Sequence, residues 1–110
     1  MRVMSSAFAL SLLLCIGVSQ AAPAEVQIKI TKFKFEPAEV TVQPGTRIRW
    51  VNLDDTPHTV LSAQGQEKVI ASKAMDTDDK YELVIGKEGD YSYFCTVHPF
   101  MTGIIHVRKR

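Results

Sequence analysis

Residues 89–103 read GDYSYFCTVHPFMTG and form the most informative stretch of the chain. Tyr91, Tyr93 and Cys95 occupy every second position, which predicts a β-strand with one face against a core. Pro99 ends this strand, because proline has no N–H group for a ladder hydrogen bond. The stretch therefore predicts a buried strand that runs into a tight loop.

The loop carries residues that bind metals. Cys95, His98 and Met101 follow one another at intervals of three, so a short loop can turn their side chains towards one point. Sulfur donors combined with imidazole favour copper, and two His, one Cys and a weak axial Met are typical of electron-transfer copper sites. The second histidine must come from elsewhere: His58 follows a predicted strand, whereas His106 lies within one and is interpreted as a surface residue.

Similar alternation recurs along the chain. The other predicted strands are 26–30, 33–35, 40–42, 47–51, 81–85 and 103–107. Phe33 and Phe35 are expected on one strand face, and Trp50 in the core. Residues 62–79 have poor periodicity and are interpreted as a loop with one helical turn at most. About seven to eight short strands separated by turn residues predict an all-β fold, a Greek-key β-sandwich or barrel in a single domain.

The N-terminus has the pattern of a secretory signal peptide. Arg2 precedes the apolar run 7–18, and small residues then stand before a cleavage site after Ala21, with Ala24 as the alternative. We expect residues 1–21 to be cleaved and residues 22–110 to form the folded domain in the periplasm. Removal of the leader would leave Cys95 as the one thiol, which suggests a metal ligand, an intermolecular bridge or a reactive group.

The charge pattern excludes some partners. The 110 residues include 13 Lys and Arg against 12 Asp and Glu, a formal net charge of +1. No basic stretch is interleaved with aromatic residues, so nucleic acid is not an expected partner. The apolar run in the leader is too short for a stable membrane anchor, and we expect a monomer.

Asn52 and His58, together with the stretch 89–103, resemble the cupredoxins, and among them the amicyanin group with its equally short ligand loop. The resemblance extends over residues 26–107. It implies a cupredoxin-like fold and one type 1 (blue) copper, held by His58, Cys95, His98 and Met101.

The resemblance also implies roles for residues beside these ligands. Asn52 would tie the two ligand loops together, and Thr59 would lie beside the metal centre. Val97 stands where amicyanins commonly have proline, so its N–H could face the thiolate and raise the reduction potential. Pro99 and Phe100 would flank His98 in an apolar patch for partner docking. The implied partners are redox proteins: methylamine dehydrogenase as donor and a c-type cytochrome as acceptor.

Two other functions stay open. A periplasmic copper chaperone or buffer would also bind copper, although such proteins favour several exchangeable Met and His ligands. A thiol enzyme would pair Cys95 with a histidine base. The preferred hypothesis is a carrier of single electrons that is not itself an enzyme.

Overall fold

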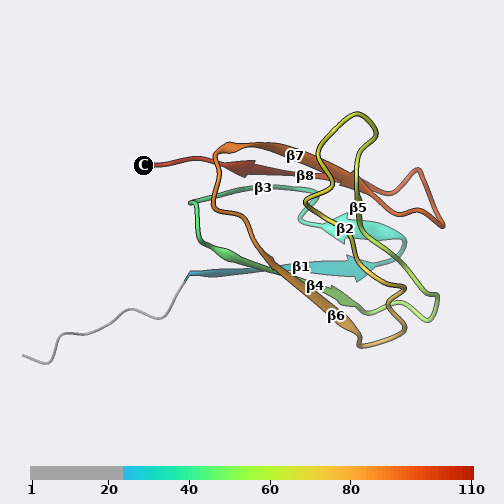
Figure 1. Ribbon diagram of the computed structural model, residues 1–110. Coiled ribbons are helices and arrows are strands. Elements are labelled where there is room, and N and C mark those ends of the chain that lie inside the picture. Colours follow the sequence, from blue (N-terminus) through green and yellow to red (C-terminus); the bar gives the residue numbers. More distant parts are fainter. Residues whose placement is uncertain (1–23) are drawn as a thin grey trace, which may run out of the picture.

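The computed structural model describes residues 24–110, so the predicted leader 1–21 lies outside the described part of the chain. Two four-stranded sheets face each other (Figure 1). The first sheet has the order β2-β1-β4-β6 and contains β1 (Glu25–Thr31), β2 (Lys34–Glu36), β4 (Arg47–Asn52) and β6 (Lys80–Val84). The second has the order β3-β8-β7-β5 and contains β3 (Glu39–Val42), β5 (Leu61–Ser62), β7 (Gly89–Phe94) and β8 (Thr102–Val107). The predicted all-β sandwich is confirmed.

Alternating side chains explain why these strands form. In β1 the buried residues are Ile28 and Ile30, while Gln27 and Lys29 face solvent. The strand pairs in parallel with β4, where Ile28 lies beside Trp50. Such two-residue periodicity places alternate side chains, here Ile28 and Ile30, on the inner face of the sheet.

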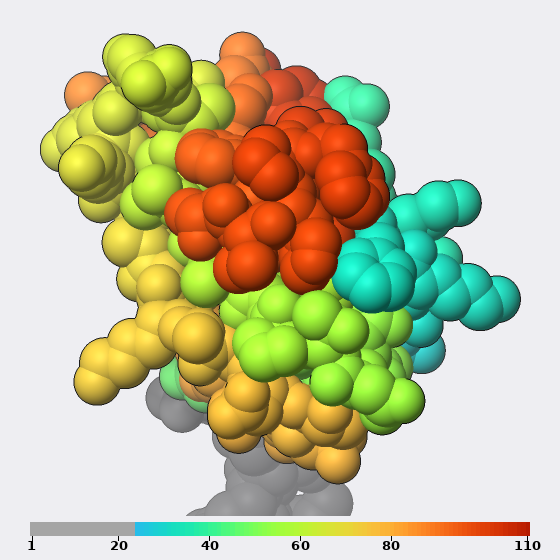
Figure 2. Space-filling model, turned by 90° about the vertical axis from the view of Figure 1, so that its right-hand side faces the viewer, coloured from blue at the N-terminus to red at the C-terminus, as the bar shows by residue number. Residues whose placement is uncertain are grey.

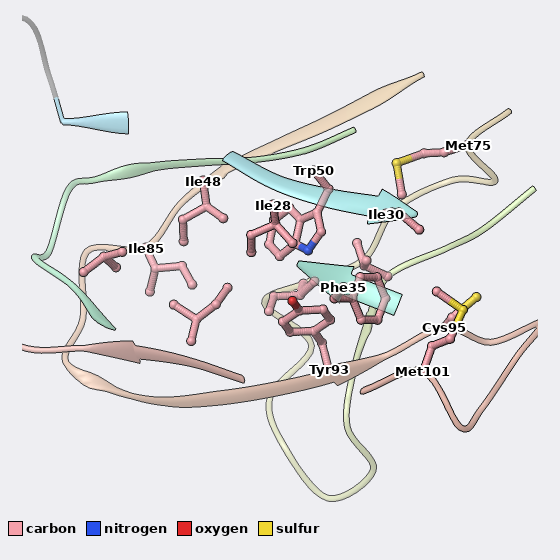
Figure 3. Close-up of a cluster of buried hydrophobic side chains, with 14 of the residues drawn as sticks. Ile28, Ile30, Phe35, Ile48, Trp50, Met75, Ile85, Tyr93, Cys95 and Met101 are labelled. Atoms are coloured by element: carbon pink, nitrogen blue, oxygen red, sulfur yellow. The ribbon is translucent and has the colours of Figure 1, made fainter. Parts of the chain in front are cut away.

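The core lies between the sheets (Figure 3). Trp50 is fully buried, as predicted, and packs against Tyr93 at a ring-centroid distance of 5.4 Å and against Tyr81 at 5.5 Å. Burial raises the pKa of Tyr93 to about 12, although the nearby Trp50 indole opposes the shift. The hydroxyl is therefore neutral, as a dry core requires.

The prediction that Phe33 shares a strand face with Phe35 is wrong. β1 ends at Thr31 and β2 starts at Lys34, so Lys32 and Phe33 form a two-residue turn. Their φ angles of 53° and 56° match a type I′ turn, which usually contains Asn or Gly. The sequence has neither Asn nor Gly here, and the alternation of Lys and Phe over residues 32–35 is typical of a continuous strand, so the sequence did not indicate the turn.

The stretch 62–79 contains no helical turn. It runs back along β5, with isolated bridges that pair Leu61 with Ala71 and His58 with Met75. Serine hydroxyl groups take the place of some backbone carbonyl acceptors here. The Ser62 hydroxyl accepts Ile70 N–H and the Ser72 hydroxyl accepts Val60 N–H, each at 2.9 Å. Across residues 24–110, we find no helix with the length and apolar character needed to span a bilayer.

His106 connects three strands of the second sheet. Its Nδ1 lies 2.6 Å from Asp90 on β7, and its Nε2 lies 2.6 Å from Glu39 on β3. The two contacts, to Asp90 first and Glu39 second, raise the pKa of His106. The side chain is thus engaged at both ring nitrogens and lies outside the cluster that contains Cys95.

This arrangement predicts a pH-dependent stability. Protonated His106 stabilises the fold fully below its unfolded pKa of about 6.5, and this contribution is lost as pH rises through the higher folded pKa. His106→Gln should therefore lower the unfolding temperature, relative to wild type, by more at about pH 5.5 than at about pH 8.5. Comparing variant with wild type at each pH cancels the titration of other groups. An equal deficit at both values would contradict the prediction.

Candidate metal centre

Two segments meet at one end of the sandwich. The loop 95–101 joins β7 to β8, and residues 53–60 join β4 to β5. Figure 2 looks onto this end: the orange-red loop lies at the centre, the green segment adjoins it, and the cyan β1–β2 turn lies beside both. The predicted site residues therefore come from strand ends that the sandwich brings together.

His58, Cys95 and His98 form a compact set of donors. Cys95 Sγ lies 3.8 Å from His58 Nδ1 and 3.9 Å from His98 Nδ1, and the three donor atoms all lie within 4.8 Å of one another. Metal bonds of about 2.0–2.3 Å at about 120° to each other would separate nitrogen and sulfur donors by about 3.7 Å. The two sulfur–nitrogen distances thus match those of a trigonal metal site, and the N and S donors suit copper.

Backbone hydrogen bonds close the ligand loop. Cys95 N–H donates to Met101 O at 3.1 Å, and Met101 N–H donates to His98 O at 2.9 Å. Met101 is 2% exposed, and Figure 3 shows its side chain beside that of Cys95. Met101 is therefore buried next to Cys95, and its part as a metal ligand stays a prediction.

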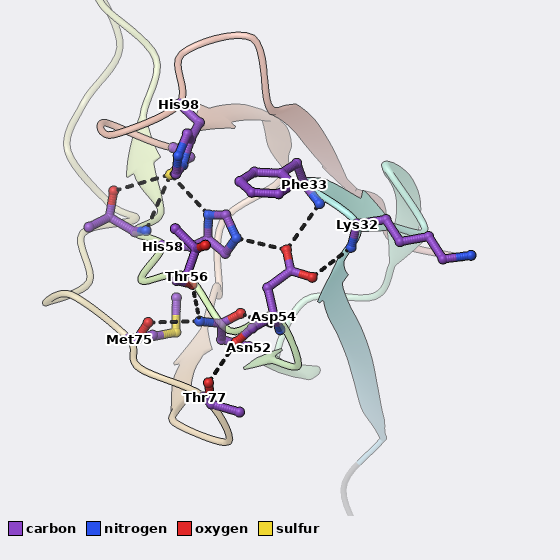
Figure 4. A network of polar contacts seen from close by, with 11 residues as sticks. Lys32, Phe33, Asn52, Asp54, Thr56, His58, Met75, Thr77 and His98 are labelled. Atoms are coloured by element: carbon purple, nitrogen blue, oxygen red, sulfur yellow. Dashed lines mark hydrogen bonds and ion pairs between the residues drawn. The ribbon is translucent and has the colours of Figure 1, made fainter.

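Asp54 orients His58. Its Oδ2 lies 2.8 Å from His58 Nε2 (Figure 4), and His58 itself is fully buried. Partial burial acts to raise the pKa of Asp54, but hydrogen bonds from Phe33 N–H, His58 and Lys32 N–H together lower it. The ionised carboxylate favours the tautomer protonated at Nε2, which leaves Nδ1 free to bind a metal.

Thr59 links the two ligand segments. Its N–H donates to Cys95 Sγ at 3.4 Å, and its Oγ1 accepts Thr96 N–H at 2.8 Å. Among the described residues, the backbone N–H that reaches Sγ comes from Thr59, and no hydrogen bond joins Val97 to Sγ. Val97 is instead 57% exposed at the surface of the loop.

Loss of the Thr59 hydroxyl should weaken metal binding. We expect Thr59→Val to lower copper(II) affinity about 10-fold, because Thr96 N–H loses its acceptor and the Cys95 loop loosens. Competition with a chelator of known affinity measures the change. Thr41→Val, an exposed position on β3, is the matched control and should leave the affinity unaltered.

Asn52 is buried but connects different segments from those expected. Its Nδ2 donates to Thr56 O at 2.9 Å and to Met75 O at 2.8 Å, and its Oδ1 accepts Asp54 N–H at 3.0 Å. Asn52 therefore shapes the segment that bears His58, whereas Thr59 makes the link to the Cys95 loop. The pairing of β5 with β7 within the second sheet causes this difference, because its antiparallel register places Thr59 opposite Thr96.

The aromatic surface around His98 completes the centre. His98 is partly buried, whereas His58 is fully buried, so His98 is the histidine that approaches the surface. Phe100 is 72% exposed, with its ring centroid 6.1 Å from that of His98, and Pro99 is also exposed. These residues form an apolar border around the imidazole.

Sequence reasoning missed Asp54, Phe33 and Thr96. Asp54 stands four residues before His58 in a polar turn, a spacing that could have suggested a hydrogen bond. Nothing in the sequence around Phe33 indicates its place at the centre, where its ring lies 5.1 Å from that of His98.

Comparisons with known proteins agree with this geometry. The family described as "Copper binding proteins, plastocyanin/azurin family" matches residues 22–108. Amicyanin-alpha of Methylorubrum extorquens is 34% identical over 93 residues, which cover 83% of this chain and 78% of that protein. The crystal structure of amicyanin from Paracoccus versutus aligns with a TM-score of 0.71 and 33% identity over 81% of this chain and 86% of that one.

A larger copper protein contains a similar domain. The copper-containing nitrite reductase of Thermus scotoductus aligns with a TM-score of 0.74 and 26% identity, over 86% of this chain and 25% of that protein. The family match spans residues 22–108, and the donor atoms of His58, Cys95 and His98 lie within 4.8 Å of one another. The chain therefore belongs to the plastocyanin/azurin family of copper-binding proteins and has amicyanins among its relatives.

Proposed function

We propose that this protein is a periplasmic type 1 copper protein that carries single electrons between redox proteins. One observation supports the proposal above all: Cys95 Sγ lies 3.8 and 3.9 Å from two histidine Nδ1 atoms, and the three donor atoms lie within 4.8 Å of one another. Relatives named amicyanin support the same function.

Each ligand has a distinct part in this proposal. Bound copper supplies the one-electron couple. Cys95, as thiolate, and the Nδ1 atoms of His58 and His98 would be the three strong copper ligands, and Met101 would be the weak fourth ligand. The hydrogen bonds to Asp54, Thr59 and the loop backbone hold these donors in place before any metal binds. A site preformed in this way needs little rearrangement when its charge changes.

Electrons would enter and leave through His98. It is the less buried of the two histidines, and exposed Phe100, Pro99 and Val97 surround it with apolar surface. Redox carriers use small contact areas, because each partner must dissociate quickly. A dehydrogenase donor and a c-type cytochrome acceptor suit such a surface, and the 1–21 leader would direct the chain to the periplasm.

Copper titration of the purified protein tests the proposal. We expect one copper(II) ion to bind per chain and to produce an intense thiolate-to-copper absorption band at about 600 nm. The colour should disappear on reduction and return on oxidation. A protein that held only copper(I), without this band, would instead be a chaperone or buffer. A protein that bound no copper and reacted rapidly with alkylating agents would indicate a thiol enzyme.

A further inference from the structure

The β1–β2 turn is held by a residue from a different segment. Lys32 and Phe33 both have left-handed backbone conformations, which side-chain-bearing residues adopt at an energetic cost. The Asp54 carboxylate accepts both of their N–H groups, from Lys32 at 2.7 Å and from Phe33 at 3.0 Å. The anchoring carboxylate offsets the cost of a turn that contains neither Asn nor Gly.

The same carboxylate also contacts a predicted metal ligand. Asp54 Oδ2 is 2.8 Å from His58 Nε2 and also accepts Phe33 N–H (Figure 4). The side chain of Asp54 is only 13% exposed, so little water competes for these contacts. The turn and the histidine are therefore fixed relative to each other by one group.

As a result, the Phe33 ring lies against both histidines. Its centroid is 5.4 Å from that of His58 and 5.1 Å from that of His98, with interplanar angles of 89° and 81°. The two imidazoles are themselves 5.0 Å apart. Edge-to-face contacts of this kind are favourable and directional. Phe33 is 40% exposed, so it also covers the histidines on their solvent side.

We propose that Phe33 and Asp54 are positioning residues of the metal centre: Asp54 locks the 32–33 turn to His58, and the turn holds the Phe33 ring across both histidines. The inference rests on the proposed function for its effect on copper. The arrangement itself is a property of the chain and can be measured without metal.

NMR spectra of the full, metal-free chain provide the first test. In the wild type we expect nuclear Overhauser contacts from the Phe33 ring to both imidazoles, and ¹⁵N shifts of His58 that report the Nε2-protonated tautomer. Asp54→Ala should abolish the contacts and mix the tautomers. Asp55→Ala, which removes the neighbouring exposed carboxylate, should change neither.

Two further variants separate positioning from folding. Asp54→Asn has a single acceptor oxygen, so it should lose either the turn contacts or the His58 tautomer while the chain stays folded. Adding Lys32→Gly to Asp54→Ala removes the energetic cost of one left-handed residue. The double variant should regain part of the Phe33 contacts but not the His58 tautomer. Unchanged ring contacts and an unchanged tautomer in both Asp54→Ala and Asp54→Asn would overturn the proposal.

Copper-loaded protein provides the second test. Phe33→Ala should lower the reduction potential, because water that reaches the histidines stabilises the more highly charged oxidised centre. Phe33→Tyr, which retains the ring, should stay close to wild type, and Leu53→Ala should control for loss of an exposed apolar side chain. Potentials equal in Phe33→Ala and wild type would overturn the role of the ring. Failure of the wild type to bind copper would reject the proposed function and leave the NMR result to decide the arrangement.

Discussion

Cys95→Ser should abolish the copper(II) absorption band at about 600 nm, because the band requires a thiolate–copper bond. Serine has nearly the same size but offers a hard, protonated oxygen in place of a soft thiolate. Cys95 is fully buried and accepts Thr59 N–H, which a serine hydroxyl can also accept. We therefore expect a folded variant whose copper(II) affinity falls well over 10-fold.

The matched control uses the histidine outside the centre. His106→Gln removes an imidazole that contacts Glu39 and Asp90, so its copper(II) spectrum should equal that of the wild type. Spectra and chelator competition on the three proteins measure the effect. Persistence of the intense band in Cys95→Ser would show that Cys95 is not the equatorial sulfur ligand, and the proposed centre would be wrong.

Gly103→Ala should cause a larger loss of stability than alanine at Gly89, the other glycine within the described strands. Gly103 pairs with Tyr93 across β7 and β8, and the tyrosine ring folds over it. A Cβ there would lie 2.3 Å from both Cζ and the hydroxyl oxygen of Tyr93. Phe35 and Trp50 pack against the same ring, at centroid distances of 4.8 and 5.4 Å, so it cannot move aside.

Overpacking of this kind costs about 1–3 kcal/mol. In a domain of this size, each kcal/mol lowers the unfolding temperature by about 4–8 °C. Gly86→Ala is the control, because a Cβ at Gly86 meets no atom within 4 Å. Calorimetry of both variants should show a clearly lowered unfolding temperature for Gly103→Ala alone. Equal unfolding temperatures would mean that the Tyr93 ring does not lie over Gly103 in solution.

Much of the fold could be predicted because its signals are local. Alternation of buried and exposed side chains depends only on the two-residue period of a strand, and it located β1, β4, β7 and β8. The alternation failed at Phe33, where a turn without Asn or Gly continues the same pattern of residues. It also left 62–79 without a clear assignment, because serine hydroxyl groups replace regular pairing there.

By itself, the sequence determined the candidate ligands, since Cys95, His98 and Met101 fall within one short loop and His58 lies in the segment after the predicted strand 47–51. Only the tertiary structure decided which groups hold those ligands. Asp54 reaches Lys32 across 22 residues, and Thr59 reaches Thr96 across 37. Each contact continues a strand pairing within one sheet, β1 with β4 and β5 with β7, and the periodicity within one strand does not encode which strand lies beside it or in what register.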